Sequence, residues 1–98
     1  MRKQCHNPYM PLWEHVPDGE PHVFGDRLYV FGSHDLENGN EFCEQDYVCW
    51  SAPVTDLSDW RCDGVIYKKE QDPYNQDALP LYAPDVVKGP DGRYYLYY

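Results

Sequence analysis

Short runs in which apolar and polar residues alternate dominate this chain, and helical periodicity is almost absent. Residues 22–24 and 27–32 are two β-prone runs on either side of Gly25-Asp26, which is a strong signal for a two-residue hairpin turn. Further strands are predicted over residues 46–52, 60–67, 85–87 and 93–98, the last two as a second hairpin. The pattern therefore predicts an all-β fold.

The segments between these runs are rich in turn-forming residues. Residues 33–45 contain many Asn, Gly, Asp and Glu residues and predict a polar loop. Residues 54–59 predict a single helical turn with Thr55 or Asp56 as its cap. Residues 68–80, with two prolines and several acids, predict a long loop.

The two hairpins resemble each other in sequence. A Pro-x-Val-x run followed by an Arg-led run begins at Pro21 and Arg27, and again at Pro84 and Arg93, at offsets of 63 and 66 residues. A period in the sixties that holds four short strands suits one β-propeller blade with long loops, although two related hairpins in a β-sandwich would look similar. Because the sequence stops within a predicted strand, we expect residues 1–98 to be the N-terminal portion of a single propeller domain.

Aromatic residues make up 16% of the 98 residues, with ten tyrosines among them. Such rings pack a sheet core or form platforms for sugar rings, because Tyr and Trp combine a broad face with a polar tip. Eight basic against 17 acidic residues leave a formal charge of −9, which disfavours nucleic acid as a partner.

The compartment is predicted from the N-terminus and the cysteines. The first residues lack the apolar run of a signal peptide and no segment is apolar enough to span a membrane, so we expect a cytoplasmic protein without a membrane partner. Cys5, Cys43, Cys49 and Cys62 lack paired zinc-type spacing, and reduced, partly buried thiols are favoured. A disulfide between Cys43 and Cys49 is the alternative if the protein is exported.

The histidines lack ligand spacing, so neither a metal nor a cofactor is assigned.

The candidate chemistry lies around the first hairpin. Asp18 directly precedes this hairpin, and Ser33, His34 and Asp35 follow it. One carboxylate at a strand entrance, with polar groups converging on it, is what a water-activating base in a sugar-cleaving enzyme needs. Taken alone, Asp18-Gly19 could equally be a turn dipeptide.

Two motifs carry a resemblance to a known family. One is Asn7-Pro8 leading into PDGEPHVFGDRLYVFGSHD over residues 17–35, and the other is YAPDVVKGPDGRYYLYY over residues 82–98. Together they resemble the N-terminal part of glycoside hydrolase family 43. The resemblance runs over nearly all 98 residues and implies the first blade and part of the second blade of a five-bladed β-propeller. It also implies activity on arabinose- or xylose-containing oligo- or polysaccharides.

The resemblance implies a general base at Asp18. A gap-free match from Ser33 backwards places the family's catalytic Asp on Asp18, whereas matching the local acid-Pro dipeptide places it on Glu20-Pro21. Asp18 is preferred, because the hairpin then aligns without gaps. Gly19 follows this base where the family pattern has Pro, and Glu20 stays open as the alternative.

The resemblance also implies substrate-binding residues near that base. They are His34, Asp35, Tyr82, Ala83 and Asp85. Tyr82 stands where the family has Trp and could stack on a sugar face, with core packing as the equal alternative. A polar strand end is the simpler interpretation of His34 and Asp35.

The implied reaction is hydrolysis with inversion at the anomeric carbon. The general acid and a third, pKa-tuning carboxylate of the family match no segment of these 98 residues, so we expect the chain to be inactive by itself. A non-catalytic carbohydrate-binding propeller is the alternative function.

Overall fold

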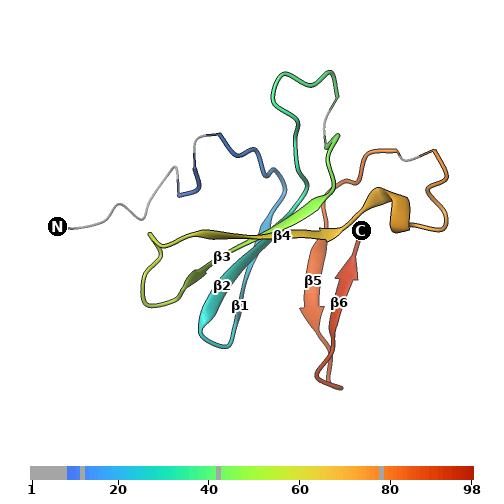
Figure 1. Ribbon diagram of the computed structural model, residues 1–98. Helices are drawn as coiled ribbons and strands as arrows, with labels where there is room; N and C mark the ends of the chain where they lie inside the picture. Colours follow the sequence, from blue (N-terminus) through green and yellow to red (C-terminus); the bar gives the residue numbers. More distant parts are fainter. Residues whose placement is uncertain (1–8, 12, 42, 78) are drawn as a thin grey trace.

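A computed structural model describes residues 9–11, 13–41, 43–77 and 79–98. It contains two antiparallel sheets and almost no helix (Figure 1). The first sheet has the strand order β1-β2-β3-β4, and the second consists of β5 and β6. The strands are β1 Glu20–Phe24, β2 Arg27–Gly32, β3 Tyr47–Pro53, β4 Arg61–Tyr67, β5 Asp85–Lys88 and β6 Tyr94–Tyr97. The all-β prediction is confirmed, and each strand lies within a few residues of its predicted range.

The first hairpin forms as its sequence predicts. Phe24 is opposite Arg27, so Gly25 and Asp26 make a two-residue loop. Gly25 has a φ of 65°, a conformation that a residue without Cβ adopts at little cost. This short loop fixes the register in which β1 and β2 pair.

The strand β3 forms the core of the first sheet. Residues 47–52 are all buried, and β3 pairs with β2 on one side and with β4 on the other. Val48, Trp50 and Ala52 lie on one face, and Tyr47, Cys49 and Ser51 lie on the opposite face, because side chains alternate along a strand. A near-continuous apolar run is what an interior strand covered on both faces requires.

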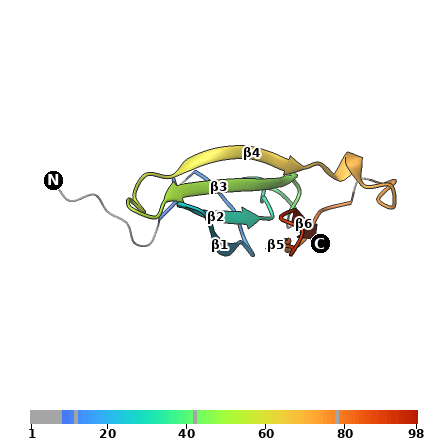
Figure 2. The ribbon, with the colours of Figure 1, turned by 90° about the horizontal axis from the view of Figure 1, so that it is seen from below.

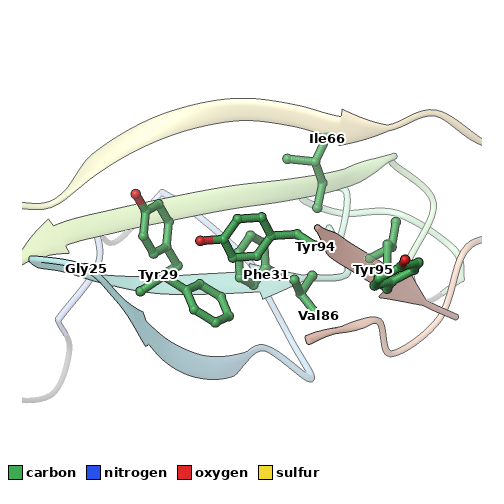
Figure 3. A pocket seen from close by; sticks show the side chains of 9 residues that line it. Gly25, Tyr29, Phe31, Ile66, Val86, Tyr94 and Tyr95 are labelled. Carbon is green, nitrogen blue, oxygen red and sulfur yellow. The ribbon is translucent and has the colours of Figure 1, made fainter. Parts of the chain in front are cut away.

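The second hairpin lies beside the first sheet, as both views show (Figures 1 and 2). The rings of Phe24 and Tyr94 meet edge to face with centroids 4.9 Å apart. Between the two sheets lies an apolar groove of about 490 Å³, and Tyr29, Phe31, Ile66, Val86 and Tyr94 point into it (Figure 3). Tyr94 and Tyr95 of the second hairpin thus line the space between the two sheets.

One local prediction is wrong. Residues 54–59 form two successive turns, where a helical turn was expected. The Oδ1 atom of Asp56 accepts hydrogen bonds from the backbone N–H of Ser58 at 3.1 Å and from its hydroxyl at 2.5 Å. An Asp side chain that binds the backbone two residues ahead competes with helix formation, which explains the turn.

The long loop after β4 contains one short element that was not predicted. Lys69–Gln71 form a 3-10 helix, η1, and the side chain of Gln71 accepts a hydrogen bond from the backbone N–H of Lys68 at 2.8 Å. Among the described cysteines, Cys43 and Cys49 are free and buried and Cys62 is free and exposed, whereas Cys5 and His6 lie outside the described residues.

Candidate functional site

Five of the candidate site residues lie at the same end of the strands. Asp18 precedes β1, His34 and Asp35 follow β2, and Tyr82 and Ala83 precede β5. Consecutive antiparallel strands place the start of one strand beside the end of the next. The segment before β1 and the loops 33–46 and 68–84 therefore extend to the same side, at the top of Figure 1.

Asp18 is held in position by the segment around it. A Cβ atom on Gly32 would collide with Cγ1 of Val16, and one on Gly19 would collide with Val30, so this segment packs directly on β2. Asp18 is exposed and has a φ of 60°. Asp tolerates this left-handed conformation better than most residues. Asp18 thus lies exposed in a closely packed turn.

Asp18 and Asp35 lie near one buried thiol. Cys43 is 2% exposed, and its backbone N–H donates to Oδ1 of Asp35 at 2.7 Å. Burial raises the pKa of the Cys43 thiol, a hydrogen bond to Ser33 lowers it, and the negative charges of Asp35 and Asp18 raise it further. We call Asp18, Ser33, Asp35 and Cys43 the Cys43 cluster.

The segment before β5 is tied to this cluster through Ser33. The backbone N–H of Ala83 donates to Oγ of Ser33 at 2.7 Å, and the hydroxyl of Tyr47 donates to the carbonyl of Tyr82 at 2.6 Å. Ser33 and Tyr47 are fully buried, so these bonds fix the backbone of the segment. The side chain of Tyr82 is exposed and keeps a face that a ligand can reach. Asp18, Asp35 and Ala83 are thus brought into one neighbourhood.

The side chain of His34 does not join the Cys43 cluster and contacts Glu14 instead. Its Nε2 atom lies 2.5 Å from Oε1 of Glu14, and Oε2 of the same carboxylate accepts the indole N–H of Trp50 at 3.1 Å. Ser33 and His34 are adjacent in an extended segment, and adjacent side chains there point to opposite sides. Ser33 therefore joins the Cys43 cluster, while His34 contacts the N-terminal segment and β3.

Asp85 and Glu20 lie apart from the Cys43 cluster. Asp85 accepts a 2.6 Å hydrogen bond from Nε2 of His22, and this bond, with a second from the backbone N–H of Val86, lowers the pKa of its carboxyl group. Its side chain is 55% exposed and joins β5 to β1. Glu20 is the first residue of β1, where it pairs with Phe31 of β2, and it is exposed.

Glu14 and Cys43 were not among the site residues predicted from the sequence, and Ser33 was named only as one of the polar residues that follow the first hairpin. The available signal for Glu14 was its place in the sequence, as an acid between Trp13 and His15 in a segment that continues to Val16.

Within the described ranges, no group of three His, Cys, Asp or Glu side chains is arranged to hold a metal ion. In the same part of the chain, no helix is long and apolar enough to cross a membrane.

Three curated proteins are similar to this chain. The chain is 66% identical over 99 residues to a "Xylosidase/arabinosidase" of Thermoclostridium stercorarium, a match that covers all of the chain and 21% of that protein. It is 34% identical over 101 residues to "Xylosidase/arabinosidase 43A" of Humicola insolens and 31% identical over 97 residues to a "Xylosidase/arabinosidase" of Bacteroides ovatus. These two matches cover 90% and 92% of the chain and 29% of each relative.

The chain therefore spans between a fifth and a third of the length of these relatives. No family model and no solved structure matches it. The three shared names support a member of a glycoside hydrolase family.

Proposed function

We propose that the natural polypeptide that carries these 98 residues hydrolyses O-glycosidic bonds in arabinose- or xylose-containing oligo- or polysaccharides. The observation that carries this proposal is the 66% identity, over the whole chain, to a protein named xylosidase/arabinosidase. Identity at this level along the whole chain includes both hairpins and the loops that surround the Cys43 cluster.

The proposed architecture is a five-bladed β-propeller of glycoside hydrolase family 43. The first sheet, with strand order β1-β2-β3-β4, is one blade, and β5 and β6 are the inner strands of the next. The repeat supports this assignment, because the β1–β2 and β5–β6 hairpins are its two copies. The apolar groove between the sheets then belongs to the packing between neighbouring blades.

In the proposed reaction Asp18 is the general base. Its exposed carboxylate takes a proton from a water molecule as that water attacks the anomeric carbon. A protonated carboxylic acid, roughly 6.5–9.5 Å away, donates to the leaving oxygen, and the product has inverted configuration. That acid and the carboxylate that tunes it come from outside these 98 residues, since no segment here matches their motifs.

The remaining candidates border the same end of the strands. Asp35 and the Tyr82–Ala83 segment form the wall of the sugar subsite nearest Asp18, and the exposed ring of Tyr82 stacks on a sugar face. Ser33 and Cys43 support this wall from beneath, through their bonds to Ala83 and Asp35. A reduced Cys43 and a cytoplasmic location are part of the proposal.

The test is an assay of the natural polypeptide on 4-nitrophenyl α-L-arabinofuranoside and 4-nitrophenyl β-D-xyloside. We expect hydrolysis of at least one of them, with ¹H NMR showing inversion in the first-formed sugar. The purified 98-residue chain should be inactive on both. Saccharide binding without hydrolysis by the natural polypeptide would instead establish a non-catalytic propeller and refute the enzyme proposal.

A further inference from the structure

The Glu14 carboxylate is buried and hydrogen-bonded at both of its oxygens. Its side chain is 6% exposed, and both of its oxygens accept hydrogen bonds. Oε1 accepts from Nε2 of His34 at 2.5 Å and from the backbone N–H of His15 at 3.1 Å, and Oε2 accepts from the indole of Trp50 at 3.1 Å. Three donors from three parts of the chain fix this carboxylate.

This carboxylate determines which nitrogen of His34 carries the proton. An ionised carboxylate oxygen only accepts hydrogen bonds, so Nε2 must be the protonated nitrogen that donates to Glu14. In the neutral ring Nδ1 is then an acceptor. Nδ1 has no hydrogen-bond partner among the described residues, and none of their buried side-chain nitrogens or oxygens lacks one. The His34 side chain is 17% exposed, so water or a ligand can reach its ring.

The His34 ring borders a hollow of about 340 Å³ on the face of β3 and β4. Val48 and Val65 form part of the apolar lining, while Glu44 and Lys69 contribute polar groups. An apolar surface with several polar groups around it suits a sugar ring, which presents C–H bonds on its faces and hydroxyl groups at its edge. The acidic side chains, Glu14 among them, oppose the entry of an anion.

We propose that Glu14 is a positioning residue, which orients His34 so that its Nδ1 atom accepts a hydrogen bond from a hydroxyl group of the saccharide. The identity of the ligand rests on the proposed function, whereas the role of Glu14 rests on the bonds that it makes here. Such a carboxylate fixes the tautomer and the ring orientation of a histidine that itself contacts the ligand. His34 then belongs to the binding site through the hollow on the face of β3 and β4, whose lining does not include Asp18.

The first test measures the tautomer of His34. Long-range ¹H–¹⁵N NMR spectra of the natural polypeptide with labelled histidine should show His34 with its proton on Nε2. In Glu14→Ala the ring should lose this preference, and in Glu14→Gln, which retains one acceptor oxygen, it should recover part of it. His22→Gln is the matched control, because it breaks the exposed His22–Asp85 pair and should leave His34 unchanged. A proton on Nδ1 in the unmodified chain would overturn the proposal.

The second test uses the natural polypeptide and an arabinoxylo-oligosaccharide. Because the bond to a non-reacting hydroxyl stabilises substrate and transition state alike, Glu14→Ala and His34→Ala should each raise KM about tenfold and leave kcat nearly unchanged. The double variant should be no worse than His34→Ala, since Glu14 acts through His34. Glu14→Gln should restore part of the affinity, and circular dichroism of each variant checks its folding.

The outcomes separate this inference from the proposed function. If the Glu14 substitution reduces kcat/KM as much in the His34→Ala background as in the unmodified protein, Glu14 acts independently and the inference is wrong. If the unmodified polypeptide hydrolyses neither aryl glycoside, the proposed function is wrong, while the tautomer measurement still decides whether Glu14 positions His34.

Discussion

Two pairs of histidine and carboxylate lie in different surroundings in this chain. Glu14 and His34 are 2.5 Å apart, with side chains 6% and 17% exposed, and Asp85 and His22 are 2.6 Å apart, with side chains 55% and 31% exposed. The contact atoms are of the same types and the distances almost equal. The two pairs differ in burial and in the further donors to each carboxylate, which are Trp50 and His15 for Glu14 and Val86 for Asp85. The comparison therefore shows what burial in a hydrogen-bonded network adds to the same contact.

A buried polar group depends on its hydrogen-bond partner more than an exposed one does. Water can replace either partner of the His22–Asp85 pair, and dissolved salt screens its attraction. Water has little access to Glu14, so a donor that loses this carboxylate stays unpaired. The buried pair therefore fixes a geometry, whereas the exposed pair adds a modest attraction between β1 and β5.

Removal of the buried carboxylate should give the largest effect. Glu14→Ala leaves the indole N–H of Trp50 and the Nε2–H of His34 without their acceptor, and we expect a loss of about 2–4 kcal/mol in the free energy of unfolding. Urea unfolding followed by tryptophan fluorescence measures it. A loss no larger than that of His22→Gln would show that burial does not distinguish the two pairs.

Removal of one donor should have an intermediate effect. Trp50→Phe removes the indole N–H that donates to Oε2 of Glu14 but retains most of the aromatic bulk, so we expect a loss of about 1–2 kcal/mol. The control is Trp60→Phe, whose indole N–H donates to the carbonyl of Leu57 in a less buried position. The same urea experiment serves for both, and an equal loss in the control would assign the effect to the smaller ring.

The exposed pair should give the smallest effect. His22→Gln should reduce the free energy of unfolding by less than about 1 kcal/mol, and added salt should shrink the difference. The Asp85 pKa, lowered mainly by the hydrogen bond from His22, should rise toward its ordinary value, which ¹³C NMR of the carboxyl group reports.

The pH dependence of this exposed pair has a defined sign. A carboxyl group with a lowered pKa in the folded state stabilises the fold above about pH 4 and loses that contribution as pH falls through the lower, folded value. His22→Gln should therefore weaken the dependence of stability on pH in this acidic range. An unchanged pH dependence would mean that His22 does not stabilise ionised Asp85.

Local sequence signals predicted the strands well and the buried pair not at all. Gly25-Asp26 and the β-prone runs act over a few residues, so they fix the hairpins almost independently of the rest of the chain. The bonds of Glu14 to His34 and Trp50 span 20 and 36 residues, a range over which no periodicity in the sequence operates. Asp56 shows the opposite case, where a local side-chain bond prevented a helical turn.

The same distinction holds for the candidate site. The start of β1 and the end of β2 follow from the hairpin, so the neighbourhood of Asp18 and Asp35 was predictable once the strands were known. The direction of the His34 ring was not, because it depends on the path of the segment before Asp18 and on its packing against β2.

The central claim is that Asp18 activates water for glycoside hydrolysis, and the most direct test compares two neighbouring carboxylates in the natural polypeptide. The measurement is kcat/KM for an aryl arabinofuranoside or xyloside in Asp18→Asn and in Glu20→Gln, with both variants checked for folding. We expect a loss of about 10³-fold in Asp18→Asn and little change in Glu20→Gln. Full activity in Asp18→Asn, or a comparable loss confined to Glu20→Gln, would contradict the account.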